Sequence, residues 1–212
     1  MMQLNAYLQK HFTPFDYATT QKILAEKFNL KNLSNGKKIF LCVGAIGSGK
    51  STVIANLYAQ NLLHYPYLSD KIVAEKLSST GAPKSTCEQV AAATHKIAKN
   101  LVKSGHSFCW EPEDTNGKYL EIVDFAKKQG FKIEVFYVMT DAVNINLGRT
   151  MQRFGQSTTA QQVLDSFYGI EKQVIKLIEH CDTLDMFDNS SQFGQTKPRA
   201  NAQKETGETF CL

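Results

Sequence analysis

A glycine-rich loop constrains the fold of this chain more than any other feature of the sequence. Residues 44–51 read GAIGSGKS, a complete G-x-x-x-x-G-K-S pattern, and they directly follow an apolar run at 39–43. Glycine lets the backbone turn tightly with several N–H groups pointing inward. Residues 51–58 then have helical spacing, and the start of a helix carries a partial positive charge. Strand, loop and helix in this order predict a site for the phosphates of a nucleotide.

The side chains of the loop indicate how a nucleotide would be held. Lys50 brings a positive charge to the β- and γ-phosphates, and the hydroxyl of Ser51 is a ligand for Mg²⁺. ATP and Mg²⁺ are therefore the expected cofactors. The residues expected to contact them are Gly44, Ala45, Ile46, Gly47, Ser48, Gly49, Lys50, Ser51 and Thr52. A chance glycine-rich turn is the alternative, and the complete match with the correct flanks argues against it.

Apolar runs and helical segments alternate along the chain. The expected strands are the apolar runs at 39–43, 65–68, 107–110, 132–139 and 183–188. Helical spacing lies between them, for example at 118–129 and 159–180. Ser85 and Glu88 offer a capping box for a further helix that stops at Gly105. The alternation predicts an α/β fold with a parallel central sheet flanked by helices on both faces.

The chain divides into three parts. Residues 1–36 form a helical arm, residues 37–193 contain the phosphate loop and the strands, and residues 194–212 are a polar tail without periodicity. The arm could cover one edge of the sheet or dock a partner. The tail is expected to be flexible, because it has too few apolar residues to pack.

Charge and hydropathy exclude several classes of protein. The net charge of +4 is small, and the lysines are scattered rather than gathered into a basic stripe, so nucleic acid is not an expected partner. No run approaches the roughly 20 apolar residues of a membrane span, and the first residues do not resemble a signal peptide. We therefore expect a cytoplasmic protein without a membrane partner. The five cysteines lack the spacing of a zinc site or a disulfide framework.

Acidic residues follow three of the expected strands, where ligands collect in a parallel sheet. Asp70 follows the second strand, and a carboxylate there can accept the proton of a hydroxyl that attacks the γ-phosphate. Asp70 could instead be the N-cap of the helix that starts at Lys71. Asp141 follows the fourth strand and is expected to be an N-cap outside the site.

Glu111 terminates the third strand, beside Trp110 and Pro112. A carboxylate at this position could orient water on Mg²⁺, as a Walker-B acid does, or hydrogen-bond a polar substrate. The alternative is a solvated strand end. With Asp70, Glu111 is a candidate substrate-binding residue.

Arginine is rare in this chain, and two of its three arginines stand close together. Arg149 and Arg153 are one helical turn apart, so both can lie on one helix face. Planar guanidinium groups stabilise the charge on a transferring phosphoryl group better than lysine does. Both are therefore candidate catalytic residues, and a solvated helix face is the alternative.

The loop does not name the phosphate acceptor, because kinases, ATPases and GTPases share it. The chain has no N-K-x-D motif, so guanine specificity is unsupported. A kinase acting on a small-molecule hydroxyl is the expected function. The alternatives are a metabolite kinase of the gluconate or adenylate class and a module that binds ATP without transferring phosphate.

The sequence resembles the zeta toxins and their chromosomal relatives. The similarity covers about residues 38–191 and rests on the phosphate loop, Asp70, the strand that ends at Glu111, and the later arginines Arg149 and Arg153. The resemblance implies a P-loop kinase fold and an enzyme that phosphorylates a sugar hydroxyl of UDP-N-acetylglucosamine. It also implies a small helical antitoxin as a partner.

The resemblance assigns roles to single residues. It implies Lys50 and Ser51 as the groups that hold ATP and Mg²⁺, Asp70 as the base and Glu111 as a substrate ligand. Arg149 or Arg153 would stabilise the charge that moves. The chain departs from the family where Pro112-Glu113 replaces small hydroxylic residues, and where Gly155-Gln156-Ser157 replaces a Gly-Gly-His turn. These departures bear on the acceptor rather than on the type of reaction.

Overall fold

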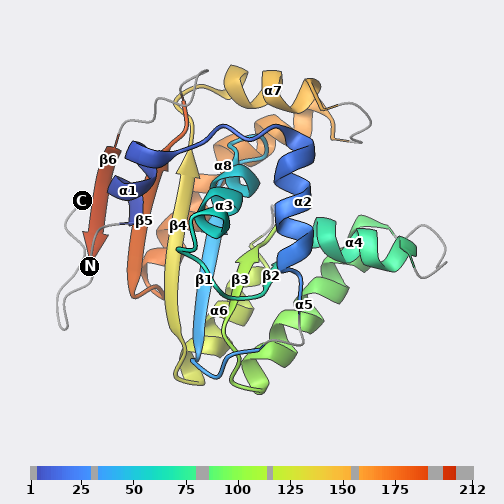
Figure 1. The fold of residues 1–212 in the computed structure, drawn as a ribbon, viewed down its shortest axis with the longest axis vertical. Coiled ribbons are helices and arrows are strands. Elements are labelled where there is room, and N and C mark those ends of the chain that lie inside the picture. Colours follow the sequence, from blue (N-terminus) through green and yellow to red (C-terminus); the bar gives the residue numbers. More distant parts are fainter. Residues whose placement is uncertain are drawn as a thin grey trace.

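A six-stranded sheet forms the centre of the computed structural model, which describes residues 4–29, 33–79, 86–113, 117–153, 158–190 and 198–203 (Figure 1). The strands are β1 (Lys38–Val43), β2 (Tyr67–Ser69), β3 (Phe108–Glu111), β4 (Lys132–Met139), β5 (Thr183–Asp188) and β6 (Pro198–Gln203). Their order is β2-β3-β1-β4-β5-β6. β1 to β5 pair in parallel and β6 pairs antiparallel with β5. The expected parallel sheet is confirmed.

Helices cover both faces of the sheet. They are α1 (Leu4–His11), α2 (Tyr17–Lys27), α3 (Lys50–Ala59), α4 (Asp70–Ser79), α5 (Cys87–Lys103), α6 (Tyr119–Lys128), α7 (Val143–Met151) and α8 (Ala160–Ile178). α5, α6 and α8 bury apolar side chains against one face, while α1, α2 and α3 do so against the other (Figure 1). None of the described helices is both long and apolar enough to cross a membrane.

The central strand β1 shows why the expected strands read as continuous apolar runs. Ile39 and Leu41 belong to one buried cluster, whereas Phe40 and Cys42 belong to the other. Successive side chains of a strand point to opposite faces, so a strand covered on both sides is apolar at every position.

The arm packs on the body of the molecule. α1 lies against β5 and β6, and α2 lies against α3 (Figure 1). Leu8 of α1 and Leu24 of α2 are buried in the same cluster as Phe40 and Val53. The sequence leaves open whether the arm covers one edge of the sheet or docks a partner. In the described residues it covers one face of the sheet near its edge, which is closer to the first expectation.

Two expected helix caps are wrong. The capping box of α5 lies one residue later than expected: Thr86 Oγ1 accepts from the Gln89 N–H, and Gln89 Oε1 accepts from the Thr86 N–H. Asp141 is not the N-cap of α7, since Ala142 occupies that position and the Asp141 N–H donates to Ser190 Oγ at 2.8 Å. At Asp141, the hydrogen bond to Ser190, which is distant in the sequence, stands where a local cap was expected.

Residues 198–203, assigned from sequence to the flexible tail, form β6 and pair with β5. An edge strand requires only backbone partners, so apolar periodicity does not reveal it. The division of the chain into three parts stays a prediction.

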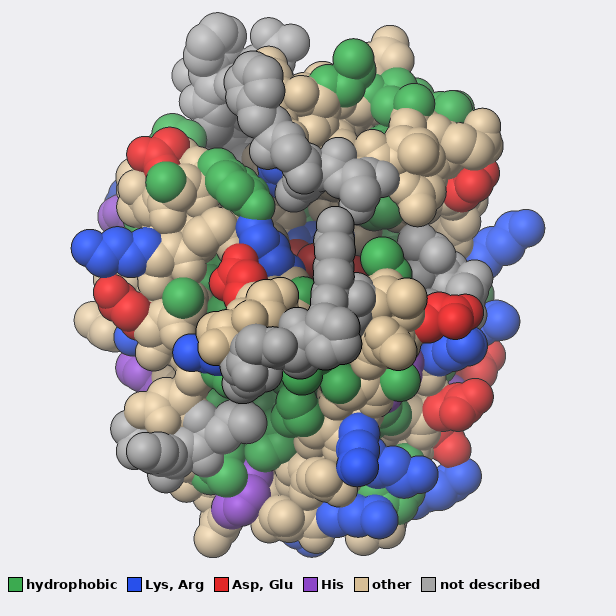
Figure 2. Space-filling view, turned by 90° about the vertical axis from the view of Figure 1, so that its right-hand side faces the viewer, with side chains coloured by type: hydrophobic (Ala, Val, Ile, Leu, Met, Phe, Trp, Pro, Cys, Tyr) green, Lys and Arg blue, Asp and Glu red, His purple; other side chains and the backbone are tan. Residues whose placement is uncertain are grey.

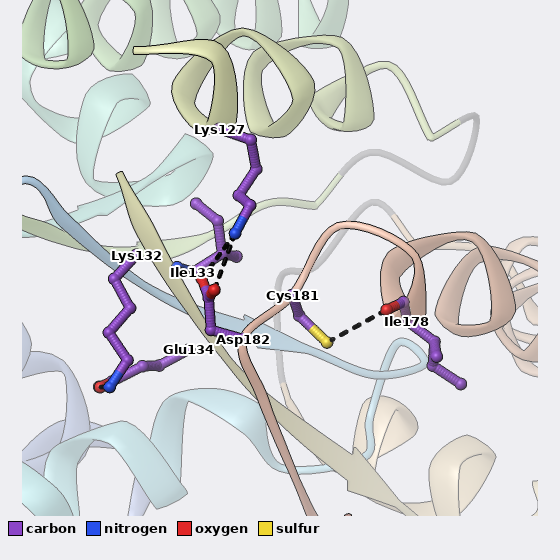
Figure 3. Close-up of polar contacts among 7 residues, drawn as sticks. All are labelled: Lys127, Lys132, Ile133, Glu134, Ile178, Cys181 and Asp182. Atoms are coloured by element: carbon purple, nitrogen blue, oxygen red, sulfur yellow. Dashed lines mark hydrogen bonds and ion pairs between the residues drawn. The ribbon is translucent and has the colours of Figure 1, made fainter. Parts of the chain in front are cut away.

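Charged side chains tie together the amino ends of β4 and β5 (Figure 3). The Asp182 carboxylate accepts from Lys127 Nζ at 2.8 and 2.9 Å and from the Ile133 N–H at 2.7 Å. Glu134 forms ion pairs with Lys38 at 3.0 Å and with Lys132 at 3.4 Å. Each of these two carboxylates has a cationic partner, so we assign them a structural role at this end of the sheet.

Candidate active site

The phosphate loop joins β1 to α3 and requires glycine at two positions. Gly47 has φ 81° and Gly49 has φ 98°, conformations that side chains disfavour. A Cβ atom at Gly47 would lie 2.6 Å from the Asn146 carbonyl oxygen, and one at Gly49 would lie 2.3 Å from Asn189 Nδ2. The neighbouring segments therefore approach the loop more closely than any side chain allows.

Three side chains hold the loop in place: Asn146 and Arg149 of α7, and Asn189, which directly follows β5. Asn146 Nδ2 donates to the Ile46 carbonyl and Asn189 Nδ2 to the Ser48 carbonyl, each at 2.8 Å. Arg149 donates to the Ser48 carbonyl at 3.3 Å and to the Asn189 carbonyl at 2.7 Å. Arg149 thus supports the loop. The two asparagines are not predicted as site residues from the sequence, because their partners are distant in the chain.

The loop presents donors that fit the phosphates of a nucleotide. Lys50 is only 8% exposed, and its Nζ donates to the carbonyls of Gly44 at 3.0 Å and Ala45 at 3.2 Å. The Ser48 hydroxyl is buried and finds no partner among the described residues. Buried donors are normally paired, so this loop has unused capacity for anionic oxygens.

Glu111 lies beside the loop because β3 pairs with β1, with Leu41 opposite Trp110. The carboxylate is buried, with 3% of the residue exposed. It accepts from Ser51 Oγ at 2.9 Å and from the Tyr67 hydroxyl at 2.6 Å. Burial, and then the charge of Glu111, raise the pKa of Tyr67 well above its usual value, so the phenol stays protonated and donates. A solvated strand end is excluded.

Ser51 and Glu111 provide oxygen ligands of the kind that Mg²⁺ prefers. Within the described part of the chain, no cluster of three or more His, Cys, Asp or Glu side chains could hold a metal ion. Mg²⁺ commonly uses one or two protein ligands together with substrate phosphates and water. The residues therefore fit an ion that arrives with a nucleotide.

A cavity of about 160 Å³ opens in front of the loop. Nine expected site residues line it together, among them Lys50, Ser51, Glu111 and Arg153; the other five are Gly44, Ile46, Gly47, Gly49 and Thr52. Seen from the side of α4, basic and acidic side chains meet in a hollow of the surface (Figure 2). Arg149 lines a second groove of about 330 Å³. Because Gly49, Thr52 and Arg153 line both, groove and cavity adjoin.

Asp70 is the first residue of α4 and directly follows β2, at the carboxyl end of the sheet. It does not precede its helix, so the N-cap alternative is wrong. Ser69 comes before it, and its Oγ accepts from the Ile72 N–H at 3.4 Å. Asp70 is half-buried and is not among the described residues that line the cavity.

Two charged residues of the cavity were missed as site residues. Glu113 lines the cavity together with Glu111. Lys71, which carries the opposite charge, lines the same cavity. The surrounding protein atoms, and then the charge of Glu111, raise the pKa of Glu113 to about 7, although the residue keeps access to solvent. Burial lowers the pKa of Lys71. The departure from the family pattern at Pro112-Glu113 is the sequence signal for Glu113, and Lys71 has no such signal.

Arg153 points its charge into the cavity. Burial lowers its pKa, and the charges of Glu111 and Glu113 act in the opposite direction. An arginine side chain remains a cation under these conditions. The roles of the arginine pair are therefore divided: Arg153 lines both the cavity and the adjoining groove, whereas Arg149 lines only the groove and holds the loop through Ser48.

Neither a family model nor a curated protein sequence matches the chain, whereas solved structures do. A chain of the AvrRxo1-ORF1:-ORF2 structure with ATP has 15% identity and a TM-score of 0.60, covering 99% of this chain and 68% of that one. A chain of the PezAT chromosomal toxin-antitoxin system of Streptococcus pneumoniae has 11% identity and a TM-score of 0.57, covering 84% and 80%. The fold is that of a zeta-toxin-like P-loop kinase.

The similarity also extends beyond the sheet. A chain of the Pnkp1/Rnl/Hen1 RNA repair complex has 16% identity and a TM-score of 0.51, covering 87% of this chain and 54% of that one. The AvrRxo1 match covers nearly all of this chain, so it includes the arm. At these identities the similarity concerns the zeta-toxin-like fold, and the fold that the sequence resemblance implies is confirmed.

Proposed function

We propose that this protein is an ATP- and Mg²⁺-dependent kinase that transfers the γ-phosphoryl group to a hydroxyl of a small molecule. The observation that carries the proposal is the hydrogen bond between Ser51 and Glu111 at the phosphate loop. It brings a Mg²⁺-binding hydroxyl and a buried carboxylate to one place. Lys50 and Arg153 line the same cavity, so charges of both signs surround the point of transfer.

Each residue has a separate task in the mechanism. The N–H groups of the loop and Lys50 would hold the β- and γ-phosphates, while Ser51 and Glu111 would hold Mg²⁺ or its water. The ion neutralises phosphate charge when it is bound. Arg153 stabilises the charge that spreads over the transferring oxygens, and Arg149 keeps the loop in position through Ser48. Positioning and electrostatics supply most of the rate in such reactions.

Asp70 is the proposed base that takes the proton of the attacking hydroxyl. It begins α4 at the same end of the sheet as the loop, and its charge acts on Glu113 in the cavity. A carboxylate needs only hydrogen-bond reach of the acceptor hydroxyl for this task. Asp70→Asn should therefore lower kcat by about 10²-fold or more, and Glu113→Gln by less than about tenfold.

The acceptor proposed first is the sugar hydroxyl of a UDP-amino sugar, with UDP-N-acetylglucosamine as the specific candidate. The sequence resemblance to zeta toxins and the fold shared with the PezAT chain support this choice. The same two facts support a small helical antitoxin as a partner. The structure of the AvrRxo1 complex with ATP supports ATP as the donor.

Incubation with γ-labelled ATP and a panel of hydroxylated metabolites tests the proposal. The panel contains UDP-N-acetylglucosamine, other nucleotide sugars, gluconate, shikimate and AMP, and Lys50→Ala is the control. Transfer to UDP-sugars alone supports the proposal. Transfer to gluconate or AMP replaces it with a metabolite kinase, and intact ATP binding without any turnover, unchanged by Asp70→Ala, replaces it with a binding module.

Growth measurements test the toxin part of the proposal separately. Expression of the intact protein should slow growth, and expression of Lys50→Ala at equal level should not. Equal inhibition by both proteins, or by neither, would contradict a kinase toxin while leaving the transfer assay unaffected.

A further inference from the structure

The N-terminal arm supplies one wall of the cavity in front of the phosphate loop. Tyr17, Thr20 and Gln21 of α2 line this cavity. They are held there because α2 packs on α3, the helix that begins at the loop. The start of α2 is fixed as well, since the Asp16 side chain accepts from the Thr19 N–H at 2.7 Å. The wall is therefore part of the folded site.

Thr20 has the property expected of a ligand-binding residue. It is only 2% exposed, and its hydroxyl has no hydrogen-bond partner within the described residues. A buried hydroxyl without a partner is unfavourable, and such groups are rare in folded proteins. No contact inside the arm explains why a threonine stands here. A ligand that enters the cavity can satisfy the group.

Tyr17 connects the arm to both sides of the cavity. Lys71 of α4 donates to its hydroxyl, and Lys71 Nζ lies 4.1 Å from the ring centre. The guanidinium of Arg153 lies 5.5 Å from the same ring centre. Through Tyr17 the arm therefore contacts two cations that line the cavity, Lys71 and Arg153.

We propose that α2 forms the acceptor subsite and that this subsite binds a hydroxyl-rich small molecule such as a sugar derivative. The proposal rests on the proposed kinase function. The Thr20 hydroxyl and the Gln21 carboxamide both donate and accept, and Glu113 accepts, which matches the hydroxyl groups of a polyol. A hydroxyl is recognised strongly by groups that are otherwise left unpaired.

The size and position of the cavity support a small acceptor. A volume of about 160 Å³ beside a groove of about 330 Å³ is suited to small molecules rather than to a folded partner. Lys71 adds one positive charge near Glu113, which allows the acceptor to carry an anionic group.

Thr20→Val tests the subsite, because valine keeps the volume of threonine and removes only the hydroxyl. Thr19→Val is the matched control: Thr19 is adjacent, exposed and outside the cavity. The acceptor is UDP-N-acetylglucosamine, or the panel member that the wild type binds best. We expect Thr20→Val to raise the KM or Kd of the acceptor about tenfold and to leave the KM of ATP unchanged. The Tm should stay at the wild-type value or rise, because valine removes a buried hydroxyl that has no partner among the described residues. Thr19→Val should leave the KM and Kd of the acceptor and the KM of ATP at the wild-type value. It removes the exposed hydrogen bond from Thr19 Oγ1 to Asp16 Oδ2 at 3.1 Å, so a small fall in Tm is the only expected change.

The outcomes separate this inference from the proposed function. A higher KM for ATP in Thr20→Val would move the residue to the nucleotide side, and higher activity in Thr20→Val or Gln21→Ala would make the arm inhibitory; either result overturns the inference. If calorimetry detects acceptor binding that Thr20→Val weakens, but no transfer occurs, the subsite stands and the kinase function fails. If the wild type binds no member of the panel, the subsite is wrong.

Discussion

Asp182 and Glu111 stand at opposite ends of the same sheet, and their partners differ. Asp182, at the amino end, receives two hydrogen bonds from Lys127 and one from the Ile133 N–H. Glu111, at the carboxyl end, is more deeply buried, yet its hydrogen bonds come from the hydroxyls of Ser51 and Tyr67. No salt bridge joins it to a described residue.

The difference separates a structural carboxylate from a functional one. Asp182 is satisfied by a cation of the protein, so it stabilises the fold and has no capacity for a ligand. Glu111 is buried and receives its hydrogen bonds from neutral hydroxyls, while the cation of Arg153 acts on it without a salt bridge, an arrangement that is unfavourable for stability. Such unfavourable charge placement is typical of functional sites. Replacing the two residues should therefore have opposite consequences for stability and for activity.

Glu111→Gln should cause the largest loss of activity. The amide keeps the size of the side chain and removes the charge that orients Mg²⁺ or its water, so phosphoryl transfer should fall by about 10³-fold. The Tm should stay at the wild-type value or rise, because a buried charge is removed. Initial rates of ADP formation and a thermal melt check both parts. A large fall in Tm would assign Glu111 to the scaffold instead.

The arginine pair sharpens the comparison within the carboxyl end. Arg153→Lys should lower kcat by about 10²-fold with little change in Tm, because lysine lacks the planar guanidinium that faces the cavity. Arg149→Lys should lower the Tm and raise the KM of ATP, because it loses the hydrogen bonds that hold Ser48 and Asn189. Equal kinetic effects of the two variants would contradict the division of the pair.

Asp182→Ala should have the reverse profile of Glu111→Gln. Loss of a half-exposed ion pair and a backbone hydrogen bond should lower the stability by about 1–2 kcal/mol, a few degrees in Tm. The kcat and the KM of ATP should not change. Lys128→Ala, which removes the exposed pair with Asp124, serves as a control and should change the Tm less.

The smallest effect concerns the pH dependence of stability at Glu113. Its pKa is raised from the usual value of 4.5 to about 7, so the folded protein holds a proton that the unfolded chain releases in this range. Stability should therefore fall as the pH rises from about 4.5 to about 7, by less than about 1 kcal/mol because solvent screens the carboxylate. Melts at pH 5 and pH 8 should show this loss in the wild type and a smaller one in Glu113→Gln.

The sequence predicts those parts of the site that local patterns and strand order determine. The loop at 44–51 is a contiguous motif, and Glu111 is placed beside it because the strand ends of a parallel sheet meet at one edge. The five apolar strands can be predicted because both faces of the sheet are covered, so nearly every strand residue is apolar. The fold and the grouping of Lys50, Ser51 and Glu111 follow from these signals, whereas Arg153 is a candidate because arginine is rare in the chain and this one stands one helical turn from Arg149.

The remaining features depend on contacts between distant segments. Asn146 and Asn189 hold the loop through carbonyl groups that no pattern marks. Thr20 and Gln21 read as ordinary helical residues, and only the packing of α2 on α3 brings them to the cavity. Aspartate is a residue type that favours the N-cap position. At Asp141, however, the backbone N–H donates to Ser190 Oγ, and Ala142 is the N-cap. Tertiary packing therefore overrides local preference at these positions.

The most direct test of the account is a single-turnover reaction of the protein with ATP, Mg²⁺ and UDP-N-acetylglucosamine, followed by mass spectrometry of the small molecules. The account predicts ADP and a singly phosphorylated acceptor in equal amounts from the wild type, and neither from Lys50→Ala or Glu111→Gln within the time in which the wild type completes one turnover. Phosphorylated acceptor formed equally by Glu111→Gln, or ADP without any phosphorylated acceptor, would contradict the claim that the carboxyl end of the sheet is a site of phosphoryl transfer to this hydroxyl.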